Sequence, residues 1–200
     1  MRIAALGAPL LLVASVVIVS VLGWMIAPLR RAMILVPYRV RNKGELWRLL
    51  TAGWLHGGVG HLAFNMLTLW FFADPVQRAL GAPAFVALYV SAVVVAFVPT
   101  TLRHMHEPGY GTIGASGAVA AVMFSAILLE PRLRLFLFFI PIPVPALVFA
   151  AGYLAYTAWQ AYGAKDGVNH GAHFAGALYG VMFTWAFEPA RVERAIRSLF

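Results

Sequence analysis

The chain has 200 residues, of which 62% are hydrophobic and 11% are charged. Soluble domains usually have roughly 45–50% apolar and about 25% charged residues, so this chain cannot cover a soluble surface and we expect most of it to lie in lipid. It contains no cysteine, which excludes disulfides, thiolate metal sites and a cysteine nucleophile. Its net charge of +8 does not indicate nucleic-acid binding, because the basic residues lie between apolar runs, as they do at membrane flanks.

Apolar runs between charges and turn residues predict six transmembrane helices, at residues 9–29, 61–77, 83–102, 115–129, 144–162 and 173–187. Each run approaches the length of about 20 residues that a helix needs to cross the hydrocarbon core. The first run is longer than a signal-peptide core and lacks a small-x-small cleavage site, which favours an uncleaved span. The expected fold class is therefore all-α, a polytopic membrane protein in which residues 1–200 form one transmembrane domain.

Two connecting segments differ from plain solvent loops. Residues 30–60 mix charges and glycines with tryptophans and leucines, which suits a membrane-interfacial loop, with a solvated loop as the alternative. Pro141, Pro143 and Pro145 alternate before span five, and each disfavours helix at the residue before it. We expect extended backbone there and a connector at the membrane surface over residues 131–144.

Polar side chains inside the predicted spans are the first functional candidates, because they are costly at membrane depth. His61 and Asn65 lie four residues apart, on one face of span two. Ser116 lies between small residues at the start of span four, which leaves its hydroxyl accessible. His173 begins span six, on a face shared with Gly176 that permits close approach to another helix.

Each of these clusters alone has a simpler interpretation, as helix packing or as a hydrogen bond between helices. Together they supply the parts of an acyl-transfer site: a hydroxyl nucleophile, a base and donors for an oxyanion. Other intramembrane chemistries lack their residues. The sequence has no His-Glu-x-x-His zinc motif, and its seven acids lie in predicted loops or near span ends, which disfavours an aspartyl dyad and a proton-coupled transporter. We expect no metal or other cofactor.

The ordered motifs resemble those of the rhomboid intramembrane serine proteases. The resemblance extends from Glu45 to Gly180 and rests on Trp47-Arg48, His61-x-x-x-Asn65, Gly114-x-Ser116-Gly117 and Ala172-His173-x-x-Gly176. It implies a six-helix rhomboid-like bundle in the bacterial inner membrane that hydrolyses peptide bonds in or beside transmembrane segments of membrane-protein substrates. It further implies that Ser116 is the nucleophile and His173 the general base, and that His61 and Asn65 join the Ser116 backbone N–H in the oxyanion hole. Span five and the loop after it would form the substrate gate.

One position departs from this family pattern. Rhomboid proteases often have an aromatic residue four positions after the nucleophile, where it packs on the catalytic imidazole, and this chain has Ala120 there. We therefore expect another aromatic residue, such as Phe174 or Tyr179, to orient His173. The departure also keeps open a second hypothesis, a catalytically weak or inactive rhomboid-like protein that binds membrane helices.

Two further interpretations concern a transport function and the histidines outside the motifs. A small channel or transporter is the third hypothesis for the whole chain, disfavoured because the predicted spans lack buried acids. The histidines outside the motifs are expected to pack in loops or at the interface, because their spacing matches no standard metal site; they are His56, His104, His106 and His170.

Overall fold

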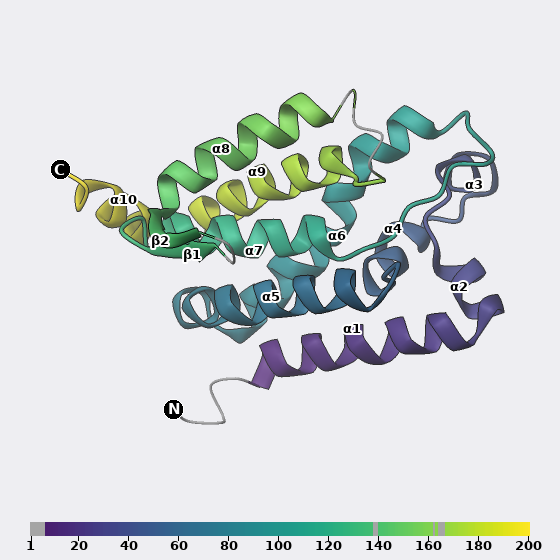
Figure 1. Ribbon diagram of the computed structural model, residues 1–200, viewed down its shortest axis with the longest axis horizontal. Helices are drawn as coiled ribbons and strands as arrows, with labels where there is room; N and C mark the ends of the chain where they lie inside the picture. Colours follow the sequence, from purple (N-terminus) through teal and green to yellow (C-terminus); the bar gives the residue numbers. More distant parts are fainter. Residues whose placement is uncertain (1–6, 138–139, 162, 164–166) are drawn as a thin grey trace.

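The computed structural model describes residues 7–137, 140–161, 163 and 167–200. The longer helices are α1 (Gly7–Met25), α5 (Val59–Leu80), α6 (Ala82–His104), α7 (Ser116–Leu129), α8 (Ala146–Gln160) and α9 (His170–Phe187). Between α1 and α5 lie the short helices α2 (Ala27–Met33), α3 (Pro37–Lys43), α4 (Arg48–Thr51) and the 3-10 helix η2 (Ala52–Trp54). The last helix is α10 (Pro189–Arg197). In Figure 1 the short helices lie at one end of the bundle, and α10 lies at the other.

Each predicted span coincides with one of the longer helices, with boundaries that differ by a few residues. Within the described ranges, α1 and α6 are the two helices long and apolar enough to cross a membrane by themselves. Helix α7 has 14 residues, so it is about 21 Å long, less than the roughly 30 Å of a hydrocarbon core. Neighbouring helices bury almost all of its side chains, so α7 need not meet lipid. The chain is mostly helical, and the number of membrane crossings stays a prediction.

Helix α7 is the centre of the bundle and packs against α5, α6 and α9. A Cβ atom at Gly176 of α9 would lie 2.0 Å from the Gly117 oxygen of α7, and one at Gly180 would lie 2.1 Å from the Ala121 oxygen. The two backbones therefore touch with no side chain between them. Both contacts advance by four residues along both helices, so α7 and α9 run parallel and begin at the same end of the bundle.

The connector before α8 contains a pair of strands that the sequence did not predict. Strands β1 (Arg134–Leu137) and β2 (Ile140–Pro145) form an antiparallel pair in which Leu135 is opposite Val144. The alternating prolines do give the predicted extended backbone. The sequence pattern did not reveal its partner, because extended backbone becomes a strand only when a second segment supplies hydrogen bonds. This hairpin lies at the α10 end of the bundle (Figure 1).

The segment between α1 and α5 packs partly into the bundle. Leu35, Leu55 and His56 are fully buried, whereas Leu46 and Trp47 are exposed. The location of residues 30–60 at the membrane interface stays a prediction.

Arg48 holds the same segment together from inside. Its guanidinium is buried and donates to the backbone oxygens of Arg31, at 2.9 Å, and Ile34, at 2.7 Å. It also forms an ion pair with Glu45. The hydrogen bond and charge of Arg48 hold the pKa of the Glu45 carboxyl below its usual range. The Trp-Arg motif thus contributes a buried clamp, Arg48, and an exposed ring, Trp47.

Candidate active site

The structure brings Ser116 and His173 together. Ser116 is the first residue of α7, and His173 lies in the first turn of α9, so the parallel arrangement of these helices places them at the same level. The distance between Ser116 Oγ and His173 Nε2 is 2.7 Å, a hydrogen-bond length. Asn169 caps α9 by accepting a hydrogen bond from the Ala172 backbone N–H at 3.0 Å, which fixes where the helix begins.

The turn before Ser116 requires glycine at position 114. Gly114 has φ +127°, a backbone conformation that L side chains rarely adopt. A Cβ atom there would lie 3.0 Å from His61 Cε1 and 3.9 Å from Ser116 Oγ. The Gly114 N–H donates to the Ala52 oxygen at 3.0 Å. Gly114 thus lets His61 approach the serine and anchors the turn to η2.

His61 and Asn65 lie on α5 beside this turn, in different environments. The His61 ring is close to Gly114, as described above, and lies at the exposed start of α5. Asn65 is buried one turn further along, and its Nδ2 donates to the His61 backbone oxygen at 2.9 Å. An amide nitrogen carries two hydrogens, so this bond leaves one for another acceptor. The His61 ring lies near the turn that carries the nucleophile, and the roles of both residues in an oxyanion hole are a proposal.

His56 is part of the site's framework, which the sequence analysis missed. The Ser20 hydroxyl of α1 donates to the Trp54 oxygen at 2.8 Å, so at 2.9 Å from His56 Nδ1 it accepts the ring N–H. His56 Nε2 is then the unprotonated nitrogen, and it accepts the Ala115 backbone N–H at 3.4 Å. His56 therefore connects α1 and η2 to the residue before Ser116. The sequence offered one signal, a second histidine five residues before His61.

The network keeps His56 neutral. The ring is 1% exposed, in the connector outside the longer helices, and its centroid lies 4.9 Å from that of His61. Burial, with a smaller contribution from His61, lowers the pKa of His56 to about 4. An uncharged ring can donate through one nitrogen and accept through the other, which is what its two partners require.

The aromatic ring stacked on His173 is Tyr153 of α8, so the expectation of Phe174 or Tyr179 is wrong. The two ring planes are 16° from parallel, and the centroids are 6.3 Å apart. Tyr179 instead donates its hydroxyl proton to Ser91 at 2.8 Å. Tyr153 lies 37 positions after Ser116, so no local motif could have identified it.

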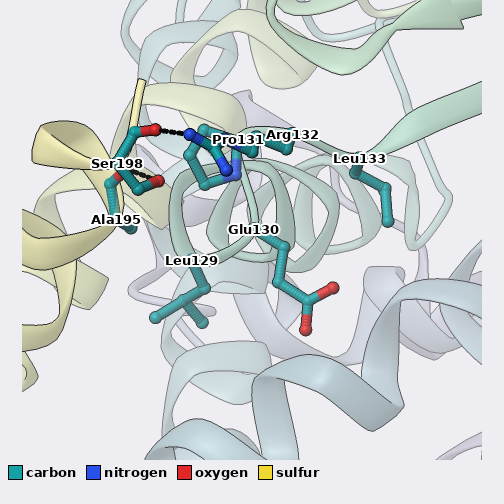
Figure 2. Close-up of a pocket in the computed structure, with 7 residues that line it drawn as sticks. All are labelled: Leu129, Glu130, Pro131, Arg132, Leu133, Ala195 and Ser198. Atoms are coloured by element: carbon teal, nitrogen blue, oxygen red, sulfur yellow. Dashed lines mark hydrogen bonds between the residues drawn. The ribbon is translucent and has the colours of Figure 1, made fainter. Parts of the chain in front are cut away.

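A surface cavity lies at the opposite end of α7 (Figure 2). Arg132 donates there to the Ser198 backbone oxygen, fastening the end of α10, and the Glu130 carboxylate points away from this pair. The lining starts at the last residue of α7, whereas Ser116 is the first. This cavity is therefore separate from the candidate site; its lining residues are Leu129, Glu130, Pro131, Arg132, Leu133, Ala195 and Ser198.

The remaining histidines have other neighbours. His104 stacks on Tyr110 with centroids 3.7 Å apart and pairs with Glu107 at 2.9 Å. His170 is buried, and its ring packs edge-on against those of His173 and Tyr156. In the part of the chain that the structure describes, His, Asp and Glu side chains form no group of three or more that could hold a metal ion.

Comparison with known proteins identifies the family. Residues 43–189 match the family model of the Rhomboid domain. The chain is 29% identical over 161 residues to the mitochondrial Rhomboid protein 1 of Saccharomyces cerevisiae, covering 76% of this chain and 44% of the yeast protein. It is 30% identical over 173 residues to the mitochondrial presenilin-associated rhomboid-like protein of Mus musculus, covering 80% of this chain and 43% of that protein.

A bacterial relative matches a shorter stretch. The rhomboid protease GluP of Bacillus subtilis is 40% identical over 77 residues, which cover 38% of this chain and 14% of that protein. The chain thus spans less than half the length of each of these three relatives. The family match covers most of the chain and includes every residue of the candidate site, so the chain belongs to the rhomboid family of integral membrane proteins.

Proposed function

We propose that the chain is an intramembrane serine endopeptidase that cleaves peptide bonds in or near transmembrane segments of membrane-protein substrates. The observation that carries this proposal is the 2.7 Å separation of Ser116 Oγ and His173 Nε2 on two helices in backbone contact. A serine hydroxyl is a weak nucleophile until a neighbouring base takes its proton. His173 is that base: it accepts the proton as Oγ attacks the carbonyl carbon and returns it to the leaving amine.

The negative charge that develops on the carbonyl oxygen is stabilised by donors around Ser116. The first N–H groups of α7 have no partner within the helix, and the positive end of the helix dipole lies there. The His61 ring and the second Asn65 N–H add side-chain donors from α5. Loss of one such donor in other acyl-transfer enzymes lowers kcat by about 10²- to 10³-fold, so the Asn65→Ala variant is expected to lose turnover far more than substrate affinity.

The membrane setting belongs to the same proposal. In this proposal all six longer helices cross the bilayer, and the Ser116 end lies near one surface, where water for the second step of hydrolysis is available. The relatives include mitochondrial proteins of yeast and mouse as well as a bacterial one. The comparisons therefore do not support assignment to the bacterial inner membrane in particular, and we propose an integral membrane location only.

Cleavage of a reporter tests the function. Purified protein in proteoliposomes is given a membrane-spanning reporter with a Gly-Pro pair near one surface, since helical backbone must open before attack. Wild type is expected to cut it and to react covalently with a fluorophosphonate, and Ser116→Ala and His173→Ala to do neither. Ser91→Ala, on α6, is the control that should retain both. Folded wild type that neither cuts nor reacts would overturn the proposal.

A second candidate function is a membrane-helix binding protein without catalysis, which Ala120 favours. It predicts a different result in the same experiment. The folded wild type would retain the reporter helix in a pull-down, leave it intact and remain unlabelled by the fluorophosphonate.

A further inference from the structure

We propose that Tyr153 of α8 is a positioning residue for His173, so that the base is held ready for catalysis only while α8 is packed against α7 and α9. This inference rests on the proposed function, since it concerns how the base of that reaction is oriented. It assigns a role to a residue outside the family motifs and links the candidate gate helix to the catalytic pair.

The geometry is that of an offset stack. Aromatic rings prefer offset or edge-on arrangements with centroids 4.5–7 Å apart, and the Tyr153 and His173 rings lie at 6.3 Å and 16°. The Tyr153 ring therefore lies nearly parallel to the imidazole and offset from it, while Nε2 at the imidazole edge is bonded to Ser116 Oγ. The His170 ring approaches His173 edge-on, at 6.0 Å and 72°. A stack on the ring face limits the rotation that would turn Nε2 away from the serine.

Helix α7 contributes a small residue to the apolar cluster on which Tyr153 packs. Ala120, four residues after Ser116, is 2% exposed and belongs to the same apolar cluster as the residues that pack on Tyr153. The Tyr153 ring lies 5.5 Å from that of Phe124 on α7 and 5.8 Å from that of Phe149 on its own helix. These rings hold Tyr153 in place, so α8 supplies the aromatic contact that α7 lacks.

Helix α8 is held more loosely than the helices that carry Ser116 and His173. Its buried residues are Ala146, Ala150 and Thr157, and a Cβ atom at Gly152 would meet nothing within 4 Å. Its outer side exposes large apolar side chains, those of Leu147, Val148 and Trp159. A shift of α8 would therefore withdraw Tyr153 from His173 while the backbone contact between α7 and α9 stays intact.

The first test distinguishes the effect of the aromatic ring of Tyr153 from the effect of its volume. Tyr153→Phe keeps the stack and is expected to stay within about twofold of wild type. Tyr153→Leu removes the stack and is expected to lower kcat on the reporter, and the rate of Ser116 phosphonylation, by about tenfold or more, since misplaced catalytic groups are costly. KM should change by less than about twofold, because a positioning role acts on the chemical step rather than on substrate binding. Trp159→Leu is the control and should match wild type, because Trp159 of the same helix is 75% exposed.

Rescue distinguishes positioning from general destabilisation. In a Tyr153→Leu background, Ala120→Phe places a ring from α7 in the space that Tyr153 vacates and is expected to recover most of the lost kcat. Wild-type kcat in Tyr153→Leu, or an equal fall in Trp159→Leu, would overturn the inference, as would rescue of thermal stability without rescue of kcat. If Tyr153→Leu does not fold, Tyr153→Met decides in its place, because it keeps the bulk and lacks the ring face.

The second test displaces α8 and leaves Tyr153 in the sequence. Ala150→Leu adds bulk at the buried side of α8 and should lower kcat as far as Tyr153→Leu does, with no further loss when the two are combined. Gly152→Leu adds similar bulk where the structure has open space and should leave kcat unchanged. An active Ala150→Leu enzyme would overturn the link to α8. A wild type that neither cuts nor reacts with the fluorophosphonate would instead mean that the proposed function itself is wrong.

Discussion

Helices α9 and α8 both pack on α7, but by different means. Glycines of α9 bring its backbone against that of α7, with no side chain that could change rotamer between them. Helix α8 meets its neighbours through alanines, a threonine and aromatic rings. The distance between Ser116 and His173 therefore depends on a rigid backbone contact, whereas the orientation of His173 depends on a side chain from a more loosely held helix. Variants that disrupt one interface at a time separate the effect on the Ser116–His173 distance from the effect on the His173 orientation.

The largest effect is expected from Gly176→Ala. Its Cβ atom would lie 2.0 Å from the Gly117 oxygen, so α7 and α9 must separate, at a cost of about 3 kcal/mol or more. We expect loss of cleavage together with a lower thermal midpoint in detergent micelles. Gly152→Ala on α8 is the matched control: its Cβ atom meets nothing within 4 Å, so activity and midpoint should be retained. Equal behaviour of the two variants would contradict the contrast between the helices.

An intermediate loss of stability is expected when the pH is lowered, because His56, which supports the turn before α7, must then bind a proton. Its folded-state pKa of about 4 lies below the ordinary histidine value of 6.5, so folding favours the neutral ring. The corresponding stability is complete above about pH 6.5 and is lost as the pH falls to about 4, up to about 3 kcal/mol in total. The wild-type thermal midpoint should fall more steeply over this window than that of His56→Asn. A His56 imidazole NMR signal that titrates near pH 6.5 would show that the network does not hold the ring neutral.

The smallest effect is expected from buried hydroxyls. Thr184 of α9 donates to the Gly180 oxygen at 2.8 Å and hydrogen-bonds to Ser125 across the α7 interface. Thr184→Val should lower the free energy of unfolding by about 0.5–1.5 kcal/mol, the range for hydrogen bonds between membrane helices. Thr157→Val on α8 should have less effect, because the Thr157 hydroxyl donates within its own helix, to the Tyr153 oxygen at 2.8 Å. A larger loss from Thr157→Val would show that α8 is held as tightly as α9.

Much of the fold was predictable from local sequence. Helix positions follow from apolar runs between charges, because each run must bury or face lipid along its whole length. The extended backbone at Pro141, Pro143 and Pro145 follows from proline sterics alone. The pairing of that segment with residues 134–137 did not follow, since it depends on a second strand whose own sequence carries no turn or proline signal.

Some residues of the candidate site were also predictable from local sequence, and others were not. Ser116, His173, His61 and Asn65 were identifiable because polar groups at membrane depth are rare and their spacing repeats a family pattern. Their catalytic roles stay a prediction until the reporter is cut. His56 and Tyr153 were not identifiable, because nothing local distinguishes a loop histidine or a span tyrosine that reaches the site from one that does not.

The sequence by itself determined where the six longer helices lie, which glycines permit close contact and which side chains are available for acyl transfer, because hydropathy, side-chain volume and functional groups are local properties. Only the tertiary structure decided that α7 and α9 run parallel in backbone contact, that His56 supports the turn before the nucleophile and that Tyr153 stacks on His173. These are relations between segments far apart in the chain, and their geometry follows from how whole helices pack.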